Sequence, residues 1–532
     1  MLAIEMILEA IAQKVATEKK LREIKAQFAG NSGSLIANSK LVEAYLKLLK
    51  SKKIRQQPDL EKILKKSRIR TLSGVSPVAV LTKPSGCPGQ CVFCPTERGM
   101  PKSYLSNEPA VMRAIRAKFD PWRQIKDRLR ALESCGHATE KIELIVMGGT
   151  FSAHPKNYQN WFLRRCFFAL NSRKAKSGSL EDLKTANEKS KHRVVGLTLE
   201  TRPDFIDASE VQNFLRLGAT RVEIGVQNLD DKILAISKRG HGVAESIEAI
   251  RLLKNAGLKV GVHLMPNLPG ATPKSDFKMF EKLFGDENFK PDQIKIYPTV
   301  LVAGAELEKL WRTKKWQPYS DKTLTELLAK IKSIVPPWVR LTRIIRDIPA
   351  ESILAGSKLT NLRQILQQKK VFCHCIRCRE IRGTEFDAKK TKLIRRNYQA
   401  SGGKEILLSS EVDGKLISLL RLRLDKKATV RELHTFGEEI RISKSGNSQH
   451  RGFGKKLILA AEKTARKNSF EKLRIISGVG VREYYRKLGY KLDAEKIYME
   501  KKLGNFSNPK SRVSQGQTTT TANSGWTFWN YY

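Results

Sequence analysis

The pattern of apolar and polar positions divides the middle of the chain into alternating elements. Short apolar runs are separated by longer segments whose apolar residues recur every three or four positions. The runs are "VSPVAVL", "KIELIVMGG", "RVVGLTLET", "RVEIGVQN", "LKVGVHLMPNLPG" and "DQIKIYPTVL". Strand, helix and strand in this order predict a parallel α/β sheet, either open or closed into a partial (β/α) barrel.

Segments outside this array have patterns of their own. The amino terminus carries Glu5 and Glu9 within an apolar stretch, which is typical of an amphipathic helix and not of a signal peptide. "MRAIRAKFDPWRQIKDRLR" (112–130) is expected to form one basic helix. "NSRKAKSGSLEDLKTANEKSKHR" (171–193) is polar and rich in Lys and Ser, which predicts a mobile surface insertion. The low-complexity tail (504–532) is expected to be disordered.

Composition narrows the class of partner. The 532 residues suffice for two to four domains. Lys and Arg number 99 against 53 Asp and Glu, and this net charge of +46 favours a polyanion, nucleic acid before an anionic membrane. Residues 47–70 hold ten basic and two acidic residues, so they form either an arm that contacts nucleic acid or a solvated helix face. No run of about 18 apolar residues occurs, and we therefore expect no membrane span.

Three of the eight cysteines lie together in "GCPGQCVFCPTE", directly after the first predicted strand: Cys87, Cys91 and Cys94. Three thiolates can hold three irons of a 4Fe-4S cluster and leave the fourth iron open for a small molecule. Zinc with these cysteines and a further ligand is the alternative. The spacing is too short for a disulfide framework in so long a chain, which favours reduced thiols and a cytoplasmic location.

A second triplet, Cys373, Cys375 and Cys378, occurs in "VFCHCIRCREI". Close cysteine spacing in a small loop favours a structural zinc ion, with a second iron-sulfur cluster and unpaired buried cysteines as the alternatives. His374 is the nearest candidate for a fourth ligand, although its position between two ligands makes the geometry awkward.

A glycine-rich loop opens a helix in "SQHRGFGKKLILAAEKTARK". Gln449, Gly452 and Gly454 form a Q-x-x-G-x-G pattern between a strand candidate and an amphipathic helix, as in loops that bind a pyrophosphate. Tyr484 and Tyr485 follow on a later short helix. A phenol there could exchange a proton with a bound thioester, although core packing is expected for one of the pair.

These motifs resemble two known families. The C-x3-C-x2-C spacing, with an aromatic residue before the last cysteine, resembles the radical S-adenosylmethionine (SAM) superfamily, in which the open iron holds SAM. "MGGT" resembles that superfamily's motif for the SAM amino group, through Gly148 and Gly149. The glycine loop and the tyrosine helix resemble the GNAT acetyltransferases, whose ligand is acetyl-CoA. Residues 66–502 as a whole resemble the catalytic subunit of Elongator and its single-chain archaeal and bacterial relatives.

The Elongator resemblance rests on segments spread along the chain, among them "NEPAVMRAIRAKFDPW", "LTLETRPD", "RGH", "VPPWVRLTRIIRDIP", "RELHTFG" and "ISGVGVREYYRKLGY". It implies a partial (β/α) barrel of radical SAM type, a small zinc-binding linker and a GNAT α/β domain. The implied segments are a basic, mostly helical arm for tRNA (1–70), the radical SAM domain (71–345), the linker (346–400), the GNAT domain (401–503) and the tail (504–532). The gap between Cys87 and Cys91 is shorter than the family often has.

The resemblance also implies an activity. The expected reaction forms 5-carboxymethyluridine at uridine 34 in the anticodon loop of tRNA, from acetyl-CoA, by a deoxyadenosyl radical. The catalytic residues it implies are Tyr485, Tyr484 and Lys141. The acetyl-CoA contacts it implies are Lys141, Glu432, Leu433, His434, Thr435, Phe453, Gly454, Lys455 and Tyr485, beside Gln449 and Gly452 of the loop.

The expected partner is tRNA, with no membrane, and the enzyme is expected to act as a monomer or homodimer; the sequence predicts nothing about further Elongator-like subunits. Two other functions stay open at this point. One is a protein-lysine acetyltransferase with a structural cluster, and the other is a non-catalytic RNA-binding module.

Overall fold

The structure is a computed structural model that describes residues 2–29, 35–65, 71–171, 178–440, 448–449 and 451–504. The expectation for the tail falls outside these residues, apart from Gly504. No helix in the described ranges is long and apolar enough to cross a membrane.

The central unit is a parallel sheet of seven strands in the order β1-β2-β3-β4-β5-β6-β8, and every neighbouring pair is parallel. Strands that follow one another in space as in sequence build the wall of a partial barrel, which confirms the predicted fold class. The strands are β1 (Ser76–Leu81), β2 (Lys141–Met147), β3 (Arg193–Thr201), β4 (Arg221–Gln227), β5 (Lys259–Leu264), β6 (Gln293–Ile296) and β8 (Arg340–Arg343).

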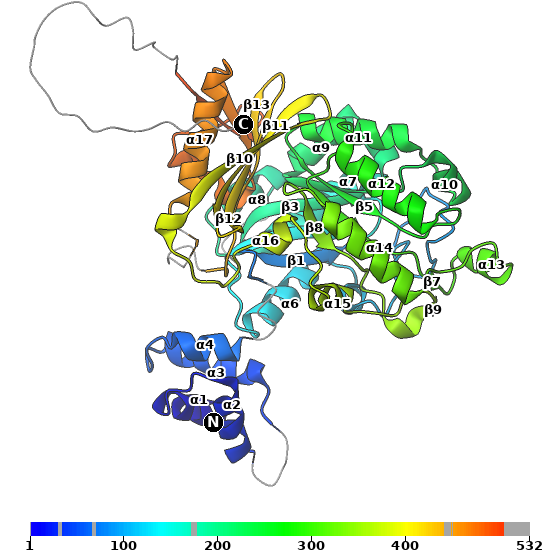
Figure 1. The fold of residues 1–532 in the computed structure, drawn as a ribbon. Helices are drawn as coiled ribbons and strands as arrows, with labels where there is room; N and C mark the ends of the chain where they lie inside the picture. Colours follow the sequence, from blue (N-terminus) through cyan, green and yellow to red (C-terminus); the bar gives the residue numbers. More distant parts are fainter. Residues whose placement is uncertain are drawn as a thin grey trace, which may run out of the picture.

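The outer face of this sheet is covered by helices (Figure 1). Alternate residues of each strand, such as Ile142, Leu144 and Val146 of β2, are buried in one apolar core with these helices. The helices in this core are α6 (Pro121–Glu133), α7 (Lys156–Leu170), α8 (Leu180–Asn187), α9 (Ala208–Leu217), α10 (Asp231–Ile236), α11 (Val243–Asn255), α12 (Pro273–Gly285) and α14 (Asp321–Ile334). α5 (Pro109–Arg116) packs beside β1 in a smaller core, and α13 (Leu307–Arg312) packs with the segment after β1. The other residues of each strand face the inside of the barrel, which we call the lumen.

Two local expectations were wrong. Residues 112–130 form not one helix but two, because Lys118 and Phe119 have positive φ values and Pro121 begins α6. Of the expected surface insertion, 172–177 lie outside the described residues. The rest includes α8, which begins with a capping box at Ser179 and buries Leu180 and Leu183 in the barrel core.

A second sheet of seven strands has the order β10-β11-β12-β13-β14-β16-β15. The pair β13 and β14 is parallel, and α17, which lies between them in sequence, packs on the sheet. β13 pairs with β14 only over 428–430, so its residues 432–435 diverge from that strand. The elements are β10 (Lys392–Ala400), β11 (Gly403–Val412), β12 (Lys415–Leu424), β13 (Ala428–Thr435), α17 (Phe453–Lys467), β14 (Lys472–Ile476), α18 (Arg482–Arg486), β15 (Lys491–Leu492) and β16 (Tyr498–Lys502).

The second sheet packs against the amino ends of the barrel strands, which we call the amino edge. Asp292, just before β6, accepts two hydrogen bonds from Arg431 of β13, of 2.6 and 2.9 Å. Arg431 also donates to Glu405 of β11, 3.1 Å away. Because all three side chains are fully buried, these ion pairs fix the position of the second sheet on the barrel.

A short connecting region between β8 and β10 joins the two sheets. It holds the strand β9 and the helices α15 and α16, and β9 pairs with β7, a short strand that follows β6. Their bounds are β7 (Leu301–Val302), β9 (Ile353–Ala355), α15 (Leu362–Gln368) and α16 (Ile376–Arg379).

The first helices form a separate group with an apolar core of their own, drawn in dark blue in Figure 1. Lys65, at the end of this group, forms an ion pair of 2.8 Å with Glu438. The helices are α1 (Leu2–Ala12), α2 (Glu18–Gln27), α3 (Asn38–Lys50) and α4 (Pro58–Leu64).

Candidate functional site

The first cysteine triplet lies at the carboxyl ends of the barrel strands, which we call the carboxyl edge. The loop after β1 brings Cys91 into a buried position, where its sulfur accepts a hydrogen bond of 3.3 Å from Arg239. A hydrogen bond from Cys94, together with the charge of Arg239, lowers the pKa of the Cys91 thiol to about 5. Cys91 is therefore held as a thiolate, the form that binds a metal.

The two glycines of "MGGT" lie at the same edge, after β2. Gly148 has φ 130°, and a Cβ atom there would lie 2.0 Å from the hydroxyl oxygen of Thr82. Gly149 has φ 89°. A side chain at either position would be strained, so the backbone of this turn stays accessible from the carboxyl edge.

Unsatisfied polar atoms gather around this loop. Buried side-chain atoms normally have hydrogen-bond partners, and those without one indicate a place for a polar ligand. Six of the atoms that find no partner within the described ranges lie at the carboxyl edge: Thr82 Oγ1, Arg202 Nη1, Gln227 Oε1, Asn228 Nδ2, Ser237 Oγ and Arg239 Nε. The cysteines and this polar ring fit an iron-sulfur cluster with SAM, which carries amino, carboxyl and ribose groups.

Sequence reasoning missed both arginines at this edge. Arg239 contacts Cys91, and Arg202 lies against the backbone of Gly89 in the cysteine loop. The two residues belong to segments that carry the family resemblance, "RGH" and "ETRPD". No local pattern could show that these segments meet the loop after β1.

Lys141 lies at the opposite edge, as the first residue of β2. Its ammonium group donates a hydrogen bond of 2.5 Å to the side-chain oxygen of Gln449, 308 positions away. The amide nitrogen of Gln449 donates to the carbonyl oxygens of Gly74 and Thr435. Burial lowers the pKa of Lys141 to about 8. The barrel and the glycine loop thus meet at one point, and Gln449 fixes Lys141 there.

Two other predicted acetyl-CoA residues lie on β13 beside this lysine. Glu432 accepts hydrogen bonds from Lys259 (3.1 Å) and Arg421 (2.8 Å). Burial alone would raise the pKa of Glu432, but these two cations hold it well below its usual range. Burial lowers the pKa of His434 to about 4, and its ring contacts the carbonyl oxygen of Ser73 at 2.6 Å. Leu433 and Thr435 complete this part of β13, which β14 does not cover.

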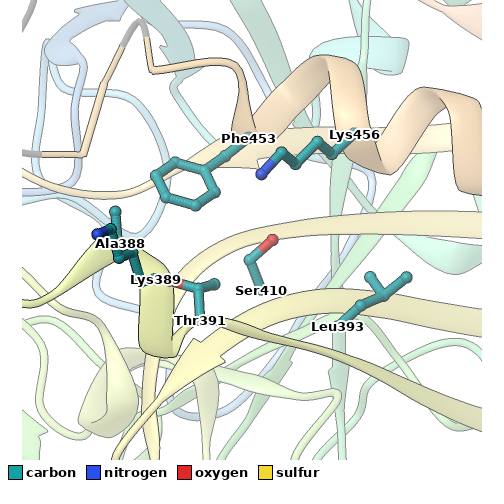
Figure 2. A pocket seen from close by; sticks show the side chains of 7 residues that line it. All are labelled: Ala388, Lys389, Thr391, Leu393, Ser410, Phe453 and Lys456. Atoms are coloured by element: carbon teal, nitrogen blue, oxygen red, sulfur yellow. The ribbon is translucent and has the colours of Figure 1, made fainter. Parts of the chain in front are cut away.

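The glycine loop leads into α17 as predicted from its pattern. Gly452 has φ 83° and begins the helix, and Phe453 is its first residue. A cavity of about 430 Å³ beside this helix end is lined by Phe453 and Lys456 of α17 and by residues of β10, β11 and the segment before them (Figure 2). Lys455 lines a second cavity, of about 250 Å³, farther along α17 with Glu462, Lys487 and Lys501, and Lys501 pairs with Glu462 at 3.0 Å. The amino end of α17, with Lys456 beside it, suits a pyrophosphate.

The structure separates the two tyrosines of α18. Tyr485 is only 4% exposed and packs in the apolar core of the second sheet. Tyr484 is 37% exposed, and its hydroxyl oxygen lies against Gly454 of the loop, 2.9 Å from where a Cβ would stand. The phenol of Tyr484 therefore lies at the glycine loop.

The second cysteine triplet is assembled in the connecting region. The sulfurs of Cys373, Cys375 and Cys378 all lie within 4.8 Å of one another, the one such group of three donors in the described residues. Hydrogen bonds from the other two thiols lower the pKa of Cys375. His374 is not in the group, and its ring packs against Phe372. Three thiols suit a zinc ion, but the structure does not bring the predicted histidine to it.

Comparison with known families divides the chain in the same way. The family described as "Radical SAM superfamily" matches residues 81–283, "Radical_SAM C-terminal domain" matches 291–370, and "Acetyltransferase (GNAT) family" matches 375–490.

Whole-chain relatives extend these matches. A Methanocaldococcus infernus protein named "tRNA uridine(34) acetyltransferase" is 46% identical over 83% of this chain and 88% of its own length. A Dehalococcoides mccartyi protein of that name is 46% identical over 80% of this chain and 97% of its own length. Human "Elongator complex protein 3" is 38% identical over 83% of this chain and 86% of its own length. The solved structure of "The archaeal Methanocaldococcus infernus Elp3 with N-terminus deletion (1-46)" superimposes with a TM-score of 0.71 and 42% identity, covering 81% of this chain and all of that one.

The fold and the two edges define a radical SAM protein joined to a GNAT acetyltransferase domain. The chain belongs to the family of Elongator complex protein 3 and the tRNA uridine(34) acetyltransferases.

Proposed function

We propose that this chain is an enzyme that modifies uridine 34 of tRNA, using acetyl-CoA and SAM to form 5-carboxymethyluridine. One observation carries the proposal: the contact between Lys141 and Gln449 joins the glycine loop to the barrel that bears the cysteine triplet. An acyl group delivered by the second sheet would therefore enter the radical SAM barrel itself. The names of the relatives supply the substrate.

The residues of each edge would have distinct tasks. Cys87, Cys91 and Cys94 would hold the cluster, and the turn at Gly148 and Gly149 would admit SAM. When bound, these groups would supply a deoxyadenosyl radical that takes hydrogen from the acetyl methyl group. The resulting carbon would add to C5 of uracil, the adduct would lose the C5 proton and one electron, and water would cleave the thioester to release CoA and leave the carboxymethyl group. Gly452 and the first turn of α17 would bind the CoA pyrophosphate, and Lys141 would orient the acyl end.

The alternative is a protein-lysine acetyltransferase with a structural cluster. A simple acyl transfer needs an amine acceptor beside the thioester and makes no use of the polar ring at the carboxyl edge. The contact of the glycine loop with the barrel favours the RNA reaction instead.

The test is anaerobic incubation of the reconstituted protein with tRNA, SAM, a reductant and acetyl-CoA, followed by mass spectrometry of the nucleosides. We expect 5-carboxymethyluridine from the parent protein and none from Cys91→Ala. Cys135→Ala, which changes a cysteine outside both triplets, is the matched control and should keep the product. Product formation by Cys91→Ala would refute the radical reaction.

We also propose a structural zinc ion on Cys373, Cys375 and Cys378. Their sulfurs are close enough to share one ion, and thiolate ligands need a reducing compartment such as the cytoplasm. Metal analysis should find one zinc per chain, lost in Cys375→Ser without loss of iron.

For the domains, we propose the helical arm, barrel, linker, acetyltransferase domain and tail described above. Because β10 pairs with β11, the acetyltransferase domain is better begun at Lys392 than at residue 401. The helical arm would contact tRNA, and the protein would act as a monomer or homodimer.

A further inference from the structure

The lumen of the barrel is polar. The inner side of a closed (β/α) barrel is ordinarily packed with branched apolar side chains. Here the strand register puts Glu143, Glu200 and Glu223 on the inner face, together with Arg221, His263 and Lys295. Between them lie Gly196 and Gly261, which contribute no side chain to the lumen.

These charges form a chain of contacts from one edge to the other. Near the carboxyl edge, Tyr104 donates a hydrogen bond of 3.1 Å to Glu200. The ring of His263 lies between Glu200 (3.5 Å) and Glu223 (3.3 Å). Glu223 is 3.6 Å from Arg221, which pairs with Glu143 at 2.5 Å.

The contacts continue toward the amino edge. Glu143 interacts electrostatically with Lys259, the partner of Glu432 on β13. Polar and charged groups thus line the lumen from Tyr104, near the carboxyl edge, to Glu432 on β13.

Water reaches this lumen. Along β2, Ile142, Leu144 and Val146 are fully buried, whereas the inward residues between them are all partly exposed. The side chain of Glu143 is 25% exposed, that of Glu200 19% and that of Lys295 18%, whereas the side chains of Arg221 (9%), Glu223 (5%) and His263 (7%) between them are buried. Charged groups at such depth keep the larger exposure only where the lumen is open to solvent. Arg221 Nε, moreover, has no hydrogen-bond acceptor in the described part of the chain.

The two edges are too far apart for direct reaction. β2 has seven residues, so an acyl group at Lys141 is roughly 20 Å from the turn at Gly148. If the proposed function holds, one reactant has to cross this distance. The pantetheine arm of CoA is long, flexible and rich in amide and hydroxyl groups, which suits a hydrated lumen lined with hydrogen-bonding side chains.

We propose that the barrel lumen is the passage through which the acyl-pantetheine arm reaches the carboxyl edge, with the nucleotide end held at α17. The proposal rests on the proposed function and adds the path of the acyl group. Lys141 and Glu143 lie at its entrance, and Glu200 and His263 near its exit.

The test is disulfide trapping in the full-length protein reconstituted with its cluster. Ile145 faces the lumen in the middle of β2, paired with Ala79 and Thr198, and the test variant is Ile145→Cys. The probe is the mixed disulfide of CoA with methanethiol. Attack of the cysteine thiolate on the CoA sulfur breaks the S–S bond, forms a protein–CoA disulfide and releases methanethiolate. Peptide mass spectrometry locates the adduct without any turnover.

The control variant is Ser333→Cys, at an exposed position of α14. We expect trapping at Ile145→Cys to saturate with probe concentration and to be about 100-fold faster than at Ser333→Cys with micromolar probe, because a bound arm has a millimolar effective concentration. Desulfo-CoA, which lacks the sulfur, should suppress it. The proposal is overturned if the trapping rate at Ile145→Cys stays linear in probe concentration and is no faster than the rate at Ser333→Cys.

A second variant blocks the passage. The nearest atoms to a Cβ at Gly196 are 3.6 Å away, so Gly196→Phe can project its ring into the lumen. We expect this change to abolish trapping at Ile145→Cys while the affinity for 3′-phospho-ADP, the nucleotide end of CoA without the arm, is unchanged in calorimetry. Gly285→Phe, at an exposed glycine with no neighbour within 4 Å, is the control for added bulk. If Gly196→Phe does not fold, the trapping rate at Ile145→Cys decides by itself.

The outcomes separate this proposal from the proposed function. Saturable trapping in a protein that makes no carboxymethyluridine would keep the passage and refute the function. If the protein forms carboxymethyluridine but the trapping rate stays linear in probe concentration, the proposed function is supported and the passage is refuted.

Discussion

Glu439, a residue at the amino edge, has a pKa well above its usual range. Its carboxylate accepts a hydrogen bond of 2.6 Å from the hydroxyl of Ser76 and one of 3.3 Å from the backbone N–H of Lys141. Burial raises the pKa of Glu439 to about 7, although these hydrogen bonds and the charge of Lys141 act in the opposite direction.

This carboxyl group makes stability depend on pH. Its pKa is higher in the folded state than its usual value of 4.5, so stability falls as the pH rises between these values. Glu439→Gln keeps one donor and one acceptor but does not titrate. We expect the loss of unfolding free energy between pH 5 and pH 8 to be about 2 kcal/mol smaller in this variant than in the parent. Denaturant unfolding at both pH values measures it.

Glu438→Gln is the matched control, since the neighbouring Glu438 is substantially exposed. It should leave the pH profile of the parent unchanged. Identical profiles for Glu439→Gln and the parent would show that Glu439 is ionised in the folded protein.

Tyr484 gives a second test at this scale. Its hydroxyl lies against Gly454, whereas the ring of Tyr485 is in the core. Tyr484→Phe should weaken acetyl-CoA binding about tenfold, the effect of one lost hydrogen bond, without changing Tm. Tyr485→Phe should leave the affinity as it is. Isothermal calorimetry distinguishes the two, and the reverse result would restore the role that the family resemblance implies for Tyr485.

At the scale of elements, local sequence patterns predicted correctly whether most segments are strands or helices. The remaining segments differ from the prediction because of packing between distant parts of the chain. The alternating runs predicted the barrel strands, and the Q-x-x-G-x-G pattern predicted the start of α17. The insertion with α8 was misjudged because its many Lys and Ser residues hid the capping box at Ser179 and the two leucines that it buries. Composition over a long window dilutes a signal that occupies four residues.

The interface between the sheets depends on Arg431. Replacing it by Met would leave Asp292 and Glu405 buried without this cation, which costs about 3–5 kcal/mol. Thermal unfolding of Arg431→Met should show a clear decrease in Tm. Arg395→Met, at an exposed position of β10, removes the same charge and should change Tm by less than about 1 °C. Equal Tm values for both variants would mean that packing alone holds the interface.

At the scale of the whole molecule, the net charge of +46 is distributed over every domain, and the helical arm contributes an exposed basic segment. Lys52, Lys53 and Arg55 are exposed between α3 and α4, where they can contact phosphates. Binding through such contacts releases counterions and weakens with salt.

The triple change K52Q/K53Q/R55Q should therefore lower tRNA affinity about tenfold at 0.1 M salt and reduce the slope of log affinity against log salt by about 1 to 3. Filter binding over a salt series measures both. K274Q/K278Q/K282Q, on the exposed side of α12, removes the same charge from the barrel and should have a smaller effect. Equal effects would show that the arm has no special role.

The sequence by itself determined the elements and the chemistry they could carry. Periodicity showed which residues alternate between the two faces of a strand. The spacing of cysteines and glycines indicated metal ligands and ligand-binding loops whose residues lie close together in the sequence. Only the tertiary structure decided that Lys141 meets Gln449, that the hydroxyl of Tyr484 reaches the loop, and that the barrel lumen is polar. These facts depend on which distant segments pack together, and a local pattern shows that a residue faces inward but not what it meets there.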